Sequence, residues 1–204
     1  MGTILASDLI VKFKYAYDNK WGYIINTAGI LWTQAKQNAT TSATAKEYGS
    51  QWIGHYVADC SGLFTWAFNQ LGGFMYHGSN TMWSSYCTSK GKLKNGKRSD
   101  GQILKPGTAV FVLKGTSDRS HVGLYIGNGE VIEASSTKVG VIKTKITNTK
   151  WCEWGELKGV EYTVTETPNS TVGSAMVNAV RVALRSGPST NDAVLMRVDK
   201  GERV

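Results

Sequence analysis

The 204-residue sequence has few of the residues that build covalent staples and metal sites: it holds only three cysteines, three histidines and three prolines. Cys60, Cys87 and Cys152 lie far apart and are odd in number, so they do not indicate a disulfide framework. No C-x-x-C pair is present, and His55 and His77 do not stand at metal-ligand spacing from a cysteine. We therefore expect no metal, no cofactor and at least one free thiol.

Long apolar runs are also missing. No stretch approaches the length of a membrane span, and "MGTILASDLIVKFKYAYDNK" lacks the basic region and apolar core of a signal peptide. The sequence therefore predicts neither a membrane-spanning segment nor a cleavable leader in this chain.

Acidic residues are fewer than basic ones, 15 against 23, which gives a net charge of +8. This balance favours an anionic partner, such as nucleic acid, a membrane surface or a bacterial wall with anionic polymers. No nucleic-acid recognition motif accompanies the charge, so we do not expect nucleic-acid binding. The densest basic run, residues 90–98, is rich in glycine and asparagine and is interpreted as a solvated loop.

Hydrophobic residues make up 41% of the chain, enough for a packed core in a globular protein. Apolar residues recur at helical spacing over residues 4–18 and again after Cys60, where Gly72 and Gly73 end the pattern. Between them, residues 33–51 are polar and rich in threonine and alanine, which indicates an excursion between two structured pieces. The strand candidates that follow cover residues 107–114, 121–135 and 140–146. Helices followed by an antiparallel sheet predict an α+β domain.

The chain divides by composition into three parts. Residues 1–162 form the α+β domain, and residues 163–179 are a threonine- and serine-rich linker. Residues 180–204, with "LRSGPS" and a later Lys-Gly turn, resemble the first strands of a bacterial Src-homology-3-like module that stops midway. We expect a short C-terminal β segment here, and a plain hairpin is the alternative.

Cys60 is the strongest candidate for a reactive side chain. It stands at the first turn of the helix predicted in "YVADCSGLFTWAFNQLGG", where free N–H groups stabilise a thiolate and can receive an oxyanion. Asp59 and Ser61 are natural helix caps, and Gly62 lets another segment approach closely. A buried structural cysteine is the alternative, because free cysteine is a commonly buried residue type.

A nucleophilic cysteine needs a base, and His121 is the best of the three histidines because it opens a strand after a polar turn. Glu133, on the following strand, is the leading candidate to orient its imidazole. With a two-residue turn at Asn128 and Gly129, however, Glu133 would pair with Leu124 and face away from His121. A longer turn or a bulge is needed to bring the two side chains to one face.

The combination of "DCSGLFTWAF" and "HVGLYIGNGEVIEASS" resembles the NlpC-type cell-wall cysteine peptidases, over roughly residues 15–162. The resemblance implies a papain-like fold, with N-terminal helices and a nucleophile helix packed on an antiparallel sheet. It implies that Cys60 is the nucleophile and His121 the general base. Glu133 falls where the family most often has histidine.

The resemblance also nominates residues around the nucleophile. "WGYIINTAG" is similar to the family segment that places a tyrosine near the oxyanion site, which points to Tyr23, with Tyr56 as a rival. Asn26 stands where the family usually has glycine. Asp59 and Ser61 match residues that help to hold a substrate amine in relatives.

The implied activity is hydrolysis of a peptidoglycan stem-peptide amide through a thioester, at the bond between D-glutamate and the diamino acid. An N-acetylmuramoyl-L-alanine amidase and a catalytically weak wall-binding module are the alternatives. The expected partners are stem peptides and the bacterial cell wall. We expect a monomer acting outside the cell or in the wall, either secreted or released as a phage endolysin.

Overall fold

The computed structural model describes residues 3–162, 182–185 and 194–198. Residues 3–162 belong to one compact unit, and the short strands β12 (Val182–Arg185) and β13 (Val194–Val198) belong to a second. β12 and β13 pair antiparallel. The predicted linker, residues 163–179, and the rest of the predicted Src-homology-3-like segment lie outside the described residues.

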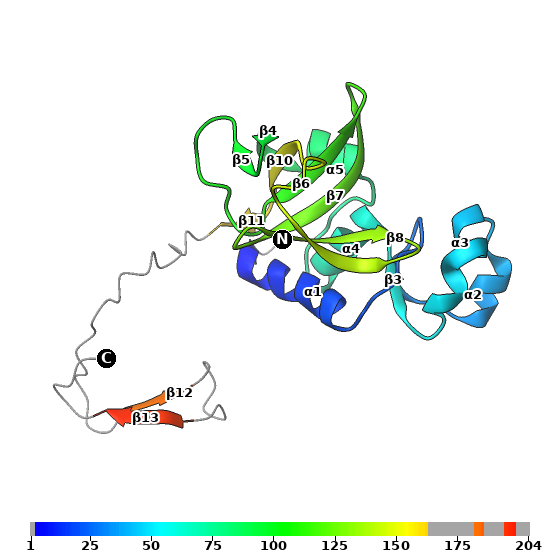
Figure 1. Ribbon diagram of the computed structural model, residues 1–204, viewed down its shortest axis with the longest axis horizontal. Helices are drawn as coiled ribbons and strands as arrows, with labels where there is room; N and C mark the ends of the chain where they lie inside the picture. The colour runs from blue at the N-terminus through cyan, green and yellow to red at the C-terminus, as the bar shows by residue number, and fades with distance from the viewer. Residues whose placement is uncertain (1–2, 163–181, 186–193, 199–204) are drawn as a thin grey trace. The chain divides into compact units, whose positions relative to one another are not determined.

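The first unit is built on a curled seven-stranded sheet in the order β5-β4-β10-β6-β7-β8-β9, with every neighbouring pair antiparallel (Figure 1). This arrangement confirms the predicted α+β class. Its strands are β4 (Cys87–Lys94), β5 (Lys97–Arg98), β6 (Ala109–Lys114), β7 (Asp118–Gly127), β8 (Glu130–Ser136), β9 (Gly140–Lys145) and β10 (Glu153–Leu157). Two small pairs flank it: β1 (Ile4–Leu5) with β11 (Val160–Glu161), and β2 (Ala28–Leu31) with β3 (Tyr56–Ala58).

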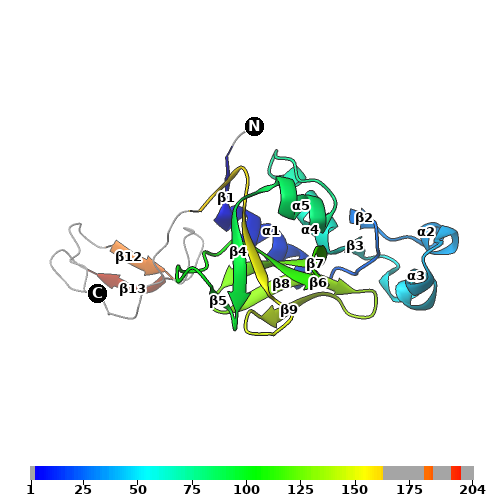
Figure 2. The ribbon, with the colours of Figure 1, turned by 90° about the horizontal axis from the view of Figure 1, so that it is seen from above.

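Helices α1 (Ala6–Asp18) and α4 (Cys60–Gln70) lie against one face of this sheet (Figures 1 and 2). The apolar positions of α1 recur at helical spacing, so one stripe is buried and the opposite face is exposed to solvent. α4 is buried or partly buried over all but its last two residues. Phe13 of α1 and Phe64 of α4 are fully buried, with ring centroids 4.7 Å apart. Burial of each large apolar side chain contributes about 2 kcal/mol. This core fixes the start of α4 against β7 and β8.

The polar stretch at residues 33–51 forms a lobe rather than a plain loop. It consists of α2 (Gln34–Ala39), α3 (Ala43–Tyr48) and the short helix η1 (Gly49–Trp52), which Figures 1 and 2 show at one end of the domain. Thr33 and Ser42 cap α2 and α3 by accepting backbone N–H groups at 3.3 Å. We call residues 33–52 the helical lobe.

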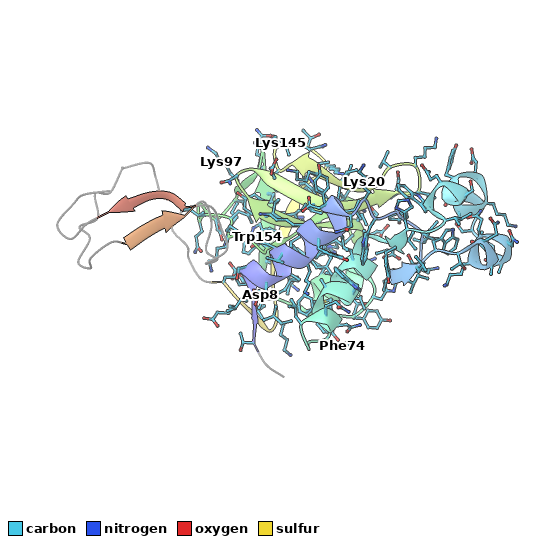
Figure 3. All side chains as sticks on the ribbon, turned by 90° about the horizontal axis from the view of Figure 1, so that it is seen from below. Asp8, Lys20, Phe74, Lys97, Lys145 and Trp154 are labelled. Atoms are coloured by element: carbon cyan, nitrogen blue, oxygen red, sulfur yellow. The ribbon has the colours of Figure 1, made fainter. Side chains whose placement is uncertain are left out.

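The remaining helix, α5 (Ser79–Ser85), packs beside β4 and β7. Figure 3 shows the side chains of the whole unit, with labels on Asp8, near the start of α1, and on Lys20, two residues beyond its end. None of the described helices is long and apolar enough to cross a membrane.

Candidate active site

Cys60 is the first residue of α4, and the residue before it caps the helix. The Asp59 carboxylate accepts the Gly62 N–H at 2.7 Å, so one free donor of the first turn is satisfied. A side chain at Gly62 would overlap the carbonyl oxygen of Thr27, which explains the glycine: the chain entering β2 passes directly over the helix start. The thiol is therefore held in a tightly packed corner.

Cys60 is only 8% exposed, and burial raises the pKa of its thiol to about 11. The Asp59 carboxylate raises the pKa further, whereas hydrogen bonds from the backbone N–H groups of Val122, Ser61 and Cys60 itself lower it. The helix start does favour the thiolate, as the sequence suggested, but burial outweighs it. A thiol in this state needs a base that takes its proton during the reaction.

His121, the candidate base, is the residue before Val122 in β7. His121 Nε2 lies 2.6 Å from Glu133 Oε2. An ionised carboxylate only accepts hydrogen bonds, so Nε2 carries the proton and Nδ1 keeps its lone pair. Nδ1 is therefore the nitrogen able to accept a proton from a nucleophile.

A register shift in the β7–β8 hairpin makes the His121–Glu133 contact possible. Gly127 pairs with Glu130, but the next pair is Tyr125 with Val131, so Ile126 is an extra residue in β7. Leu124 consequently pairs with Ile132, and Glu133 moves to the same face as His121. This is the kind of bulge that the sequence required but did not reveal.

Because Gly123 has no side chain, it leaves room beside the contact between His121 and Glu133. A Cβ atom at this position would lie 2.9 Å from the Trp151 ring and 3.3 Å from the Cβ atom of Glu133. The Trp151 ring instead stacks beside the His121 imidazole, with ring centroids 5.8 Å apart and planes at 24°. The tryptophan thus limits how far the imidazole can rotate.

Glu133 is completely buried and has further partners besides His121. Thr144 donates its hydroxyl to Oε1 at 2.7 Å, and the Lys150 ammonium lies 2.6 and 2.7 Å from the two oxygens. Burial alone would raise the pKa of Glu133, but the hydrogen bonds from His121, Lys150 and Thr144 outweigh it and hold the pKa below its usual range. Glu133 therefore stays ionised next to His121.

Asp59 is held by a second network. His77 Nε2 lies 2.8 Å from both carboxylate oxygens, and the Asn26 N–H donates to Oδ2 at 2.7 Å. The Ser61 hydroxyl donates to Oδ1 at 3.2 Å. Asp59 is 4% exposed, so its oxygens are engaged inside the protein. A role for Asp59 and Ser61 in holding a substrate amine stays a prediction.

The two candidate tyrosines have different surroundings. Tyr23 packs against the buried cluster that contains Cys60. Burial raises the pKa of Tyr23, and the electrostatic effects of Cys60 and Asp59 raise it further, so Tyr23 keeps its proton. Tyr56 is 48% exposed and stacks on Trp21, with ring centroids 5.3 Å apart. Tyr23 is thus the tyrosine packed near Cys60, and its role as a donor to the oxyanion stays a prediction.

Sequence reasoning missed three residues of this site: His77, Lys150 and Trp151. Each approaches through a loop or strand end, where no periodic pattern predicts a partner. The one signal in the sequence was the presence of two acidic residues, Asp59 and Glu133. Once they are buried, as the structure shows, their carboxylates require cationic or donor partners. That signal shows the need for partners but does not identify them.

The fold, in which a helix that begins at a cysteine packs on a curled antiparallel sheet, is papain-like. The sequence profile of the NlpC/P60 family matches residues 31–156, so the chain belongs to the NlpC/P60 family, whose members are cysteine peptidases that act on cell walls. It is therefore an enzyme of the cysteine-peptidase class.

Solved structures of the family are similar to this chain in fold. The P60 domain of an antigen from M. avium subspecies paratuberculosis is 19% identical, with a TM-score of 0.49, over 77% of this chain and 96% of that one. The NlpC/p60 domain of the peptidoglycan hydrolase SagA is 13% identical, with a TM-score of 0.47, over 74% and 98%. The peptidoglycan hydrolase RipB from Mycobacterium tuberculosis is 19% identical, with a TM-score of 0.44, over 77% of this chain and 67% of that one. A comparison with curated proteins finds no match.

Proposed function

We propose that this enzyme is a peptidoglycan endopeptidase that hydrolyses stem-peptide amide bonds, with Cys60 as nucleophile, His121 as general base and Glu133 as the residue that orients His121. The observation that carries the proposal is the 2.6 Å contact between His121 Nε2 and the buried Glu133 carboxylate, which leaves Nδ1 free to accept a proton. The bond between D-glutamate and the diamino acid is the proposed target, from the family resemblance.

In the first half of the reaction, Cys60 Sγ attacks the amide carbonyl carbon while His121 Nδ1 takes the thiol proton. The oxyanion that forms is stabilised by the backbone N–H groups at the start of α4 and by the Tyr23 hydroxyl. The protonated imidazole then gives its proton to the leaving nitrogen, the C–N bond breaks, and a thioester remains.

In the second half, His121 Nδ1 removes a proton from water, and the hydroxide attacks the thioester carbon. The C–S bond breaks, the acid is released, and the imidazolium returns its proton to the sulfur. The negative charge of Glu133 stabilises the imidazolium in both halves. A neutral residue at this position would stabilise it less.

The proposal also covers the domain organisation of the chain, its monomeric state and the place where it acts. We assign residues 1–162 to the peptidase domain, 163–179 to a linker and 180–204 to the start of a Src-homology-3-like wall-binding module. The last assignment is supported by "LRSGPS" and by the antiparallel pairing of β12 and β13. Such a module would raise the effective concentration of a monomeric enzyme at the wall. This fits an enzyme that acts in the wall, including one released as an endolysin.

The test is digestion of purified cell walls by the wild-type chain and by Cys60→Ala, with Cys87→Ala as the matched control. Cys87 is also a free cysteine, and burial raises its pKa to about 12, but it lies in β4, away from His121. We expect Cys60→Ala to lose lysis and Cys87→Ala to keep it. Undiminished lysis by Cys60→Ala would overturn the proposal.

Mass spectrometry of the released fragments identifies the bond. An endopeptidase leaves stem fragments that end in D-glutamate, still joined to the sugar. Release of whole stem peptides with a free L-alanine amine would instead identify an amidase and contradict the proposed bond.

A further inference from the structure

A cavity of about 350 Å³ lies between the helical lobe and the connection from β8 to β9. Figures 1 and 2 show this connection reaching toward α3. One wall of the cavity comes from the helical lobe, which the sequence predicted only as a polar segment between two structured pieces. The lining residues are Tyr23, Ile25, Thr44, Tyr48 and Ser135 to Lys138.

The two walls are tied together by side chains of η1. Gln51 Nε2 and Trp52 Nε1 both donate to the carbonyl oxygen of Thr137, at 2.9 and 2.7 Å. Thr137 is only 4% exposed, so these bonds are shielded from water. The lobe therefore holds the β8–β9 connection at a fixed separation, and the cavity is preformed.

The chemistry of the cavity is cationic and rich in donors. The Lys138 ammonium lies 4.4 Å from the centroid of the Tyr48 ring. Hydrogen bonding to Tyr48 raises the pKa of Lys138, so the ammonium is charged at neutral pH. The hydroxyls of Thr44, Ser135 and Ser136 add hydrogen-bond donors around it. This set suits a carboxylate ligand.

Two of the lining residues connect the cavity to the candidate active site. Tyr23 lines the cavity and also packs against the buried cluster that contains Cys60. On the other wall, Ser135 comes two residues after Glu133 in β8. A group bound in the cavity therefore contacts residues that border the candidate site on both walls.

We infer that this cavity is a substrate subsite for a carboxylate-bearing residue of the peptide, and that Lys138 is the residue that selects the carboxylate over a neutral amide. The inference rests on the proposed function, which supplies a peptide substrate. It adds a substrate class: stem peptides with a free carboxylate next to the scissile bond, in contrast to stem peptides in which that carboxylate is amidated.

The experiment compares two synthetic stem peptides that differ only in this group, as the free acid or the carboxamide. Hydrolysis is measured as kcat/KM for the wild-type chain, Lys138→Gln and Lys97→Gln. Lys97 is an exposed lysine of β5, at the end of the domain away from the helical lobe (Figure 3). It therefore controls for the loss of one positive charge.

We expect the wild-type chain and Lys97→Gln to prefer the acid by about tenfold, as one charge-assisted contact allows. Lys138→Gln should lose this preference by becoming slower on the acid alone. A preference that survives in Lys138→Gln, or a wild-type chain that cleaves both peptides equally, would overturn the inference while leaving the proposed function intact.

Binding separates the two proposals if no peptide is cleaved. Both peptides are titrated into Cys60→Ala, with and without Lys138→Gln, and the dissociation constants are compared. Tighter binding of the acid that depends on Lys138 supports the subsite even where hydrolysis fails. Equal binding of acid and amide contradicts the subsite whatever the activity.

Discussion

His77 Nε2 lies 2.8 Å from both carboxylate oxygens of Asp59, the residue that precedes Cys60 and caps its helix. Asp59 is thereby held as a buried carboxylate directly beside the thiol. After burial, its charge is the largest cause of the raised pKa of Cys60. Asp59 therefore adds to the effect of burial and makes the thiol harder to deprotonate before substrate arrives.

Asp59→Asn should make Cys60 more reactive. Asparagine is as good a helix cap as aspartate, so its oxygen can still accept the Gly62 N–H and α4 is kept. Loss of the negative charge lowers the pKa of Cys60 from about 11. We expect alkylation of Cys60 by iodoacetamide to become about tenfold faster at pH 8, because the thiolate is the reacting form.

The control for this prediction is Asp8→Asn, at an exposed aspartate near the start of α1 (Figure 3). It removes the same charge from the surface and should leave the alkylation rate unchanged. The modified peptide is identified by mass spectrometry, so that labelling of Cys87 and Cys152 is counted separately. Equal rates for wild type and Asp59→Asn at every pH would show that Asp59 does not control the thiol.

Lys150→Met should make the domain more sensitive to acid. Hydrogen bonds to Glu133 hold its pKa below the ordinary 4.5 despite burial, so the ionised carboxylate stabilises the fold above about pH 4.5 and this contribution is lost as pH falls through the lower, folded pKa. Without Lys150 the pKa of Glu133 rises. We expect acid unfolding to begin at a higher pH, with a loss of about 2 kcal/mol at pH 7.

Circular dichroism during acid titration, with urea unfolding at pH 7, measures both effects. Lys143→Met is the matched control, because Lys143 lies 3.3 Å from Glu130 in a partly exposed pair. Such surface pairs contribute less than about 1 kcal/mol. If both variants unfold alike, the Lys150–Glu133 pair stabilises the fold no more than the surface pair of Lys143 and Glu130 does.

Local patterns in the sequence predicted the parts of the site that depend on local structure. The helix start at Cys60, its Asp59 cap and the strand that carries His121 were all visible as spacing and composition. The bulge at Ile126 was not, since Asn128 and Gly129 fit a plain two-residue hairpin and only packing of the sheet decides the register.

Other features depend on tertiary structure and could not be predicted. His77 reaches Asp59 across 18 residues, and Lys150 reaches Glu133 across 17, in each case without a regular repeat between them. The net effect on the Cys60 pKa depends on burial, which a helix position alone does not give. The sequence predicted only a polar segment where the helical lobe lies, and its helices were missed. Thr33 and Ser42, which cap two of them, are nevertheless residue types that favour helix starts.

Glu133→Gln should lower kcat without changing KM. The amide oxygen can still accept the His121 Nε2–H, so the ring keeps its orientation, but the charge that stabilises the imidazolium is gone. The amide NH₂ group must also face donors from Lys150 or Thr144. We expect kcat to fall by about 10²-fold or more on a soluble stem peptide. KM should hold, because Glu133 is fully buried and does not reach the substrate.

Thr144→Val separates charge from hydrogen bonding in the same network. It removes one neutral donor to Glu133 Oε1 but leaves the carboxylate, His121 and Lys150 in place. Steady-state kinetics should show less than about tenfold loss of kcat for this variant, since one neutral hydrogen bond contributes about 1 kcal/mol. Equal losses in Thr144→Val and Glu133→Gln would mean that Glu133 acts through its hydrogen bonds and not through its charge. A fully active Glu133→Gln would remove it from the catalytic arrangement, which would then consist of Cys60 and His121.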